Sequence, residues 1–431
     1  MAGRVRRGIC VGLHKCRRGA CRTARGHCRP LPCSAGSWQI FSITASENLK
    51  NCWAHGAGGQ CPRCRNRRPA EVIAEVNATF LEGIHAASGR QRLLAWDWGW
   101  ADAWALEAIE RLSIGVELMS VSEWGLPIER GGVKTTVGEY CLSGIGPGPR
   151  AQRHWAAAKK CELTVVAKMQ VGTTWEMAAV PYLPAVENVC RHVAALRESG
   201  LNPGCSAGRL AGTRVRTSTR SRKSWPGAAS NLSRGEGTGR RTAPAAVAFW
   251  RGCSAAFSEF PFHMGTVYRA PLQVGPANSL WAKPTGYRAS MAGFPYDDLE
   301  QWRSVYLPVV FVGHLEKVST GIAAAIGELK RTVRKPAPAL AEEVSFAEVA
   351  SIHFASVANQ SRYVLSQRAG DASGMVRMIA AEEILARRLH SLQIRDSRIG
   401  FEASNQYFYV PLDLVEKAIN CRWLKSQVSG N

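Results

Sequence analysis

The chain lacks several features that would place it in a common functional class. It has no run of about 18 consecutive apolar residues, so the sequence indicates no transmembrane helix. The basic N-terminus has no apolar segment of the kind that a secretory signal requires. There is no G-x-S-x-G elbow of a serine hydrolase, and no glycine-rich loop in the context of a P-loop or a dinucleotide fold. We therefore expect no membrane partner and no organic cofactor, and a cytoplasmic location by default.

Acidic residues are scarce in two stretches, and this scarcity accounts for most of the net charge of +22. Residues 1–37 contain no acid and carry +9, and residues 201–247 contain a single acid and carry +8. A basic arm can bind phosphates without sequence preference. However, neither stretch has the interleaved aromatic residues or the helical period of a surface that reads nucleic acid. Nucleic acid is therefore a disfavoured partner.

The same two stretches lack a hydrophobic period of either 3.6 or 2.0 residues. Two interpretations stay open, namely disordered linkers or segments translated out of frame from GC-rich DNA. We accordingly expect four parts of the chain: a disordered or out-of-frame segment at 1–37, a barrel portion at 38–200, a similar basic insert at 201–247, and a mostly helical domain at 248–431.

Strand-like and helix-like segments alternate between residues 40 and 200. The β-rich runs lie at 40–46, 93–97, 116–121 and 163–169, and apolar residues at helical spacing follow each of them. This alternation predicts a parallel sheet. The long loops after the strands favour part of a (β/α)₈ barrel over a doubly wound sheet.

After residue 248 the pattern changes to amphipathic helical periods, which predict helices at 308–333, 340–368, 374–394 and 411–426. The predicted fold class is therefore α/β, with a partial (β/α)₈ barrel followed by a mostly α-helical C-terminal region.

Carboxylates lie at the ends of the predicted strands, where a barrel enzyme carries its chemistry. Glu47, Asp97 and Glu123 each end such a strand. Glycoside hydrolysis needs two carboxyl groups that flank the bond, one of them kept protonated. We predict Glu47 as the general acid/base, with Asp97 or Glu123 as its partner. For any single acid, the alternative is that it caps a helix or pairs with an arginine.

Tryptophans surround these acids in the sequence, and an indole ring offers the flat apolar face on which a sugar can lie. The predicted substrate-binding residues are Trp98, Trp100, Trp124, Trp175 and Glu176. The alternative interpretation is that the tryptophans of the second strand belong to the barrel core.

A second group of residues has the spacing of metal ligands. Cys52, His55, Cys61 and Cys64 form a C-x₂-H-x₅-C-x₂-C pattern, which offers four ligands to a tetrahedral Zn²⁺. A zinc ion bound by four protein ligands has no open coordination position, so its role would be structural. A long loop without a hydrophobic core is stabilised by such a metal cross-link. The alternative is four reduced side chains in a loop.

Several phrases of the sequence resemble a bacterial family of large, poorly characterised glycoside-hydrolase-like proteins. These are Ile43-Thr-Ala-Ser-Glu-Asn48 with Cys-Pro-Arg-Cys64, Ala95-Trp-Asp-Trp-Gly-Trp100, Met119-Ser-Val-Ser-Glu-Trp-Gly125, and Asp396-Ser-Arg-Ile-Gly-Phe-Glu-Ala-Ser-Asn405 with Tyr407-Phe-Tyr-Val-Pro411. The barrel of that family is similar to that of β-N-acetylhexosaminidases of glycoside hydrolase family 20. The resemblance covers about residues 40–200 and 248–427.

The chain also departs from these relatives. Hexosaminidases carry an adjacent Asp-Glu pair at a strand end, whereas Ser46 precedes Glu47 here, so substrate-assisted catalysis is not implied. Family members have an upstream half-barrel, and by comparison this chain looks truncated and partly frameshifted. Three functions stay open. The first is a glycoside hydrolase-like protein that acts on O-glycosidic bonds of a glycan, and this chain could be an active or an inactive form of it. The others are a non-catalytic carbohydrate-binding protein and a basic nucleic-acid-binding protein.

Overall fold

The computed structural model describes residues 39–45, 51–87, 91–201, 242–291, 294–401 and 408–429. They belong to two compact units. The first, here called the sheet unit, comprises Met1–Val121, Ala151–Lys168 and Leu201–Leu210. The second, called the helical unit, comprises Ser122–Arg150, Met169–Gly200 and Ala211–Asn431. Glu47, residues 1–37 and most of 201–247 lie outside the described residues.

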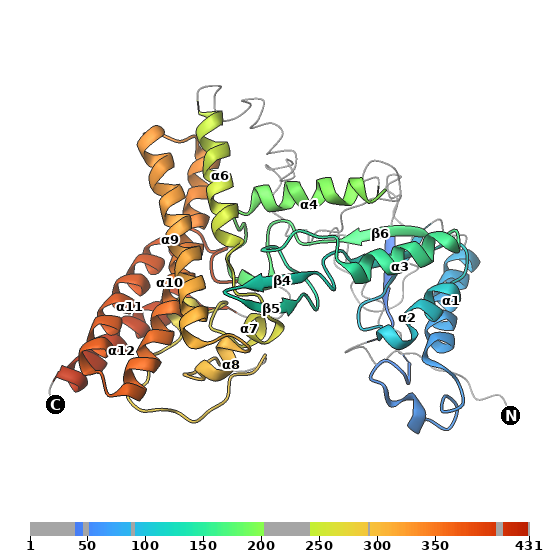
Figure 1. The fold of residues 1–431 in the computed structure, drawn as a ribbon, viewed down its shortest axis with the longest axis horizontal. Helices are drawn as coiled ribbons and strands as arrows, with labels where there is room; N and C mark the ends of the chain where they lie inside the picture. The colour runs from blue at the N-terminus through green and yellow to red at the C-terminus, as the bar shows by residue number, and fades with distance from the viewer. Residues whose placement is uncertain are drawn as a thin grey trace, which may run out of the picture. The chain divides into compact units, whose positions relative to one another are not determined.

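The sheet unit contains a parallel sheet whose strands follow one another in chain order (Figure 1): β1 (Gln39–Ile43), β2 (Arg92–Trp96), β3 (Val116–Val121) and β6 (Thr164–Lys168). The register pairs Ile43 with Trp96, and Trp96 with Met119. Every residue of β3 is buried, as is typical of a parallel strand covered on both faces. The connections carry the helices α1 (Pro69–Ala86), α2 (Asp102–Glu110) and α3 (Pro149–Lys160), and the short η1 (Ala57–Gln60) precedes α1.

The predicted α/β class with a parallel sheet is confirmed, and a complete (β/α)₈ barrel is not shown. Among the described strands, β1 and β6 form the two edges of a four-stranded sheet. Sequential order with a helix in each connection is what consecutive right-handed β/α units produce. The described sheet therefore consists of four parallel strands in chain order, joined through β/α units.

A β-hairpin occupies part of the segment that the sequence suggests is a long loop. Strands β4 (Pro127–Arg130) and β5 (Val133–Thr136) pair antiparallel in the helical unit. Gly131 and Gly132 connect them with φ of 55° and 77°, so both central residues of the turn are left-handed. This backbone matches the twist of the hairpin strands and favours Gly-Gly. A Cβ on Gly131 would lie 2.5 Å from Cγ1 of Val310, so the turn also needs glycine for space.

The rest of the helical unit is made of helices, and those after residue 248 confirm the predicted helical C-terminal region. Its longer helices are α4 (Val186–Glu198), α6 (Ala243–Phe257), α9 (Pro308–Thr332), α10 (Pro338–Ala369), α11 (Ala372–Gln393) and α12 (Pro411–Ser429). The short ones are η2 (Trp175–Met177), α7 (Met264–Arg269), η3 (Gly275–Ala277) and α8 (Leu299–Arg303). Proline begins α9, α10 and α12, where its missing N–H costs no helical hydrogen bond.

Helix α9 passes the length and composition test for a membrane span, with a mean hydropathy of 1.4 over its most apolar window. Half of that window is buried inside the protein. Small residues let α6 approach closely, because a Cβ on Gly321 would lie 2.6 Å from Cβ of Ala256. Packing within the helical unit accounts for the buried half of this window.

Lys417 of α12 is fully buried, which is unusual for a lysine. Its Nζ lies 2.8 Å from Oε2 of Glu382 on α11 and also donates to the carbonyl oxygen of Asn278. Ser356 and Asn359 of α10 donate to the same carboxylate at 3.0 Å each. The ion pair thus joins three helices, and both the ammonium of Lys417 and the carboxylate of Glu382 have further hydrogen-bond partners.

We expect Lys417→Met to destabilise the chain by about 3–5 kcal/mol, because the substitution leaves the carboxylate of Glu382 buried without its counter-charge. The free energy of unfolding is measured by urea denaturation. Arg331→Met is the matched control, since Arg331 pairs with Glu328 at the surface of α9 and exposed pairs contribute little. Equal unfolding midpoints for the two variants would contradict a structural role of the buried pair.

Candidate functional site

Asp97 follows β2 directly and lies at the carboxyl end of the sheet. Its backbone N–H donates to the carbonyl oxygen of Met119 at 3.0 Å, which extends the pairing with β3 by one residue. Its side chain is fully buried. Oδ2 accepts a hydrogen bond from Ser120 at 2.7 Å and lies 2.7 Å from Nδ1 of His154 on α3. The predicted catalytic carboxylate is therefore held by neighbouring side chains rather than presented to solvent.

The tryptophans around Asp97 have different environments. Trp96 and Trp98 stack with ring centroids 5.2 Å apart and an interplanar angle of 18°. Trp96 is buried and Nζ of Lys168 lies 3.5 Å from its ring centroid, whereas Trp98 is partly exposed. Trp100 is buried, and its Nε1 donates to Thr44 at 3.0 Å. Of the predicted platforms in the sheet unit, only Trp98 offers an accessible face.

Glu123 and Trp124 belong to the helical unit. The Glu123 side chain is fully buried, accepts a hydrogen bond from Ser122 at 3.0 Å, and places Oε1 3.7 Å from Nδ1 of His192 on α4. Burial lowers the pKa of His192 to about 4, so this imidazole is neutral at pH 7. The guanidinium carbon of Arg150 lies 4.2 Å from the ring centroid of the partly exposed Trp124.

Glu176, in η2, accepts hydrogen bonds from an adjacent loop. Its carboxylate accepts the backbone N–H groups of Leu142 and Ser143 at 2.6 and 3.2 Å, and the hydroxyl of Thr174 at 2.7 Å. Burial raises the pKa of Glu176, although these hydrogen bonds act in the opposite direction. This arrangement fastens the loop at 141–143. The neighbouring Trp175 is partly exposed and contacts Tyr268 edge to face, with centroids 5.5 Å apart.

The structure thus places each described acid of the prediction beside partners that sequence reasoning missed. Asp97 lies against His154, and Glu123 lies near His192. Both histidines are buried on predicted helices, where a single histidine on an apolar face gives no functional signal. Asp97 and Glu123 belong to different units, and Glu47 lies outside the described residues.

Three of the four predicted metal ligands come together in the loop before α1. The sulfurs of Cys52, Cys61 and Cys64 all lie within 4.8 Å of one another. A tight turn holds the last two, because the N–H groups of Cys64 and Arg65 donate to the carbonyl oxygen of Cys61 at 3.1 and 2.9 Å. The cluster could bind a metal ion.

His55 does not belong to this cluster, and its side chain is exposed. The spacing argument for four protein ligands therefore fails at the histidine. Hydrogen bonds from the backbone N–H of Arg63, from the Cys52 side chain and from the backbone N–H of Cys64 lower the pKa of the Cys61 thiol to about 7. The thiol of Cys52, hydrogen-bonded to Cys61, has its pKa raised to about 11.

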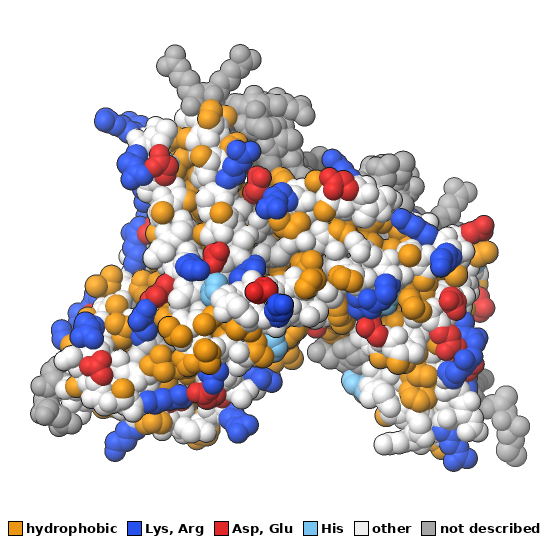
Figure 2. Space-filling view, viewed as in Figure 1, with side chains coloured by type: hydrophobic (Ala, Val, Ile, Leu, Met, Phe, Trp, Pro, Cys, Tyr) orange, Lys and Arg blue, Asp and Glu red, His pale blue; other side chains and the backbone are white. Residues whose placement is uncertain are grey.

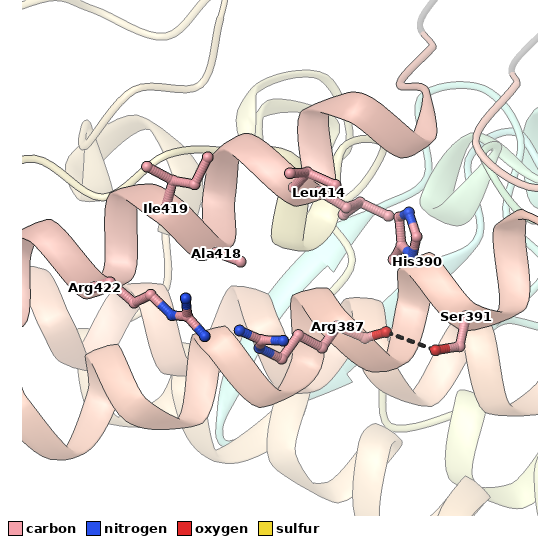
Figure 3. Close-up of a pocket in the computed structure, with 8 residues that line it drawn as sticks. Arg387, His390, Ser391, Leu414, Ala418, Ile419 and Arg422 are labelled. Atoms are coloured by element: carbon pink, nitrogen blue, oxygen red, sulfur yellow. Dashed lines mark hydrogen bonds between the residues drawn. The ribbon is translucent and has the colours of Figure 1, made fainter.

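A separate groove lies between α11 and α12, with a cavity volume of about 340 Å³. Figure 3 shows Arg387 and Arg422 extending toward each other across it, and both guanidinium groups bond to Oε1 of Glu383. Its other lining side chains are His390, Ser391, Leu414, Val415, Ala418 and Ile419. None of the lining residues is acidic, so the groove does not supply the carboxylates of glycoside hydrolysis.

Comparisons with known proteins give a distant likeness to a solved structure. No family model and no curated protein matches the chain. A solved structure of a GH138 enzyme targeting pectin rhamnogalacturonan II aligns with 84% of this chain at 9% sequence identity and a TM-score of 0.47. The chain spans 60% of the length of that enzyme. A likeness at this level does not establish a shared activity, and neither the predicted relation to family 20 hexosaminidases nor the predicted truncation finds support in it.

We expect acidification to destabilise the chain through His192. Its folded pKa of about 4 lies below the value of about 6.5 in an unfolded chain, so its contribution is fully present above pH 6.5 and is lost as the pH falls toward 4. The difference in unfolding free energy between wild type and His192→Asn should shrink by about 2–3 kcal/mol from pH 7 to pH 4. Urea denaturation at each pH measures it. A pH-independent difference for His192→Asn would refute the buried neutral state.

Proposed function

We propose that this chain is a glycoside hydrolase-like protein that binds a glycan at the carboxyl end of the parallel sheet, with Trp98 as the platform. The observation that carries this proposal is the partly exposed indole of Trp98, stacked on Trp96 directly after β2. Ligands of parallel α/β sheets bind at the carboxyl ends of the strands. A rigid indole with one accessible face suits the apolar face of a sugar ring. Trp124 and Trp175, also partly exposed, are further candidates in the helical unit.

Binding without hydrolysis is favoured by the state of the acids. Glycoside hydrolysis needs two carboxyl groups that reach the scissile bond. Asp97 and Glu123 are both fully buried, and Ser120 and Ser122 donate hydrogen bonds to them. A carboxylate that is closed to solvent and already hydrogen-bonded does not contact a sugar without rearrangement.

Hydrolysis by carboxylate chemistry is the second candidate, and the position of Asp97 favours it. Asp97 lies at the carboxyl end of β2, one residue before the proposed platform. In this mechanism Glu47 is the general acid/base, and Asp97 or Glu123 is its partner. One carboxyl group would donate a proton to the leaving oxygen, and the other would act as nucleophile or as the base that activates water.

A role in nucleic-acid binding receives less support from the described residues. On the face that Figure 2 shows, Lys and Arg side chains are interspersed with Asp and Glu over both units. Many of the described arginines form ion pairs, such as Arg362 with Glu316 and Arg388 with Glu348. A nucleic-acid-binding face instead gathers basic side chains in one patch or stripe.

Trp98→Ala should weaken glycan binding at least about tenfold, which corresponds to about 1.4 kcal/mol. Affinity electrophoresis in gels that contain each of a panel of soluble polysaccharides, pectin among them, first identifies the glycan and then measures the loss. Trp423→Ala is the matched control, because this indole is 53% exposed on α12 and belongs to the helical unit. If both variants migrate like wild type in a gel that retards wild type, Trp98 is not the platform.

The same panel, assayed for released reducing sugar, separates the two candidate functions. Release by wild type that is lost in Glu47→Gln or Asp97→Asn would establish hydrolysis. Retardation without release would establish binding alone.

We further propose that the three-cysteine cluster binds Zn²⁺ and that this metal stabilises its loop. Thiolates are preferred ligands of zinc. The loop at 51–68 has little apolar support of its own, because only Ala54 and Gly58 are buried within it. A metal bound by folded but not by unfolded chains adds its binding free energy to folding.

Removal of Zn²⁺ should expose this loop to trypsin, which cleaves after its arginines. Cleavage at Arg63 and Arg65 should become at least about tenfold faster after chelation and should slow again when Zn²⁺ is restored, because the metal contributes folding energy to the loop. Cys61→Ser should behave like the chelated protein. Cys190→Ser, at an exposed cysteine outside the cluster, should behave like wild type. A cleavage rate that is independent of chelation would count against a structural metal.

A further inference from the structure

We infer that the metal in the three-cysteine cluster keeps one coordination position open for a small nitrogen or sulfur donor from outside the polypeptide. This inference rests on the proposal that Cys52, Cys61 and Cys64 bind Zn²⁺. It differs from the sequence-based prediction of a closed structural site, because His55 is absent from the cluster. In the described part of the chain, no further Cys, His, Asp or Glu joins the three sulfurs.

The spacing of the sulfurs suits three vertices of a tetrahedron. A Zn–S bond of about 2.3 Å places the sulfurs of a tetrahedral site about 3.8 Å apart. The sulfurs here lie within 4.8 Å of one another, so side-chain rotation can bring them onto one metal ion. The turn from Cys61 to Cys64 already holds two of them on a fixed backbone. Catalytic zinc sites have this coordination, with three protein ligands and a fourth position occupied by water or substrate.

The site is accessible to an incoming ligand. Cys52 is exposed, and Cys61 and Cys64 are partly exposed. Here water can reach the ion, and so can a small donor that displaces water.

Local charge favours such a centre. Three thiolates around Zn²⁺ carry a net charge of –1, and the loop at 51–68 contains four arginines and no acid. Arg63 and Arg65 flank Cys64 and are exposed. Their positive charge offsets the negative charge of the zinc–thiolate centre. A thiolate can therefore also be accommodated as the fourth ligand. Imidazole and thiols are therefore the chemical class that the position would take, because both are good zinc ligands.

The test uses the full chain loaded with Co²⁺, which replaces Zn²⁺ and reports its ligands through visible absorption. Imidazole added to the Co²⁺-loaded wild type should shift the d–d bands in a saturable way. His55→Ala should leave both the initial spectrum and the imidazole response unchanged. Each of Cys52→Ser, Cys61→Ser and Cys64→Ser should lose about one third of the sulfur-to-cobalt charge-transfer intensity, since each removes one of three thiolates.

Cys161→Ser and Cys190→Ser are the controls for loss of a thiol outside the cluster, and far-ultraviolet circular dichroism checks that each variant is folded. Glu47→Gln is included because Glu47 is near Cys52 in the sequence. If His55→Ala or Glu47→Gln alters the initial spectrum, or if wild type ignores imidazole, the position is already filled by the protein and the inference is wrong. If wild type yields no thiolate–Co²⁺ spectrum at all, the proposed metal site itself fails.

Discussion

Asp97 accepts a hydrogen bond from Ser120 and lies against His154 at a point that is closed to solvent. An ionised carboxylate loses its hydration when it is buried, so it is retained only where other groups replace the lost water. The same constraint governs Glu176, which accepts two backbone N–H groups, and Glu382, which faces Lys417. These buried acids act as cross-links between elements that are distant in the sequence.

The burial of Asp97 determines which side chains a ligand can contact at the carboxyl end of the sheet. Because Asp97 is directed inward to α3, the residue that follows it on the outer side, Trp98, is the one that solvent reaches. In the proposed binding role the sugar contacts the indole of Trp98 while Asp97 stays buried, whereas hydrolysis would require Asp97 to leave its hydrogen-bond partners. The proposed metal ligands differ from Asp97, because the thiols of Cys52, Cys61 and Cys64 are accessible to solvent. Their loop also has little apolar support.

Sequence patterns predicted the elements of this fold well where a single physical preference dominates. The strand predicted at 116–121 and the helices predicted to begin at 308 and 411 correspond to β3, α9 and α12, which begin at those residues. The β4–β5 hairpin was missed because Gly131-Gly132 fits a flexible loop as well as a left-handed turn, and only pairing of the flanking residues distinguishes the two.

The candidate site was less predictable than the fold. The tryptophan pattern could not separate Trp98 from Trp100, because a platform and a core residue have the same side chain and differ only in what covers them. The spacing of Cys61 and Cys64 indicated that their sulfurs lie close together, because two intervening residues form a tight turn. The position of His55 depends on the path of a longer loop, which the spacing alone does not determine. His154 and His192 were missed for a similar reason: their contacts arise from helices that the sequence places far from their acids.

The division of the chain into two units has a consequence for its architecture. The polypeptide passes from one unit to the other at 121–122, 150–151, 168–169, 200–201 and 210–211. Neither unit is therefore a continuous piece of the gene, and no single cut releases either of them intact. Removal of either unit would therefore require several separate breaks in the chain.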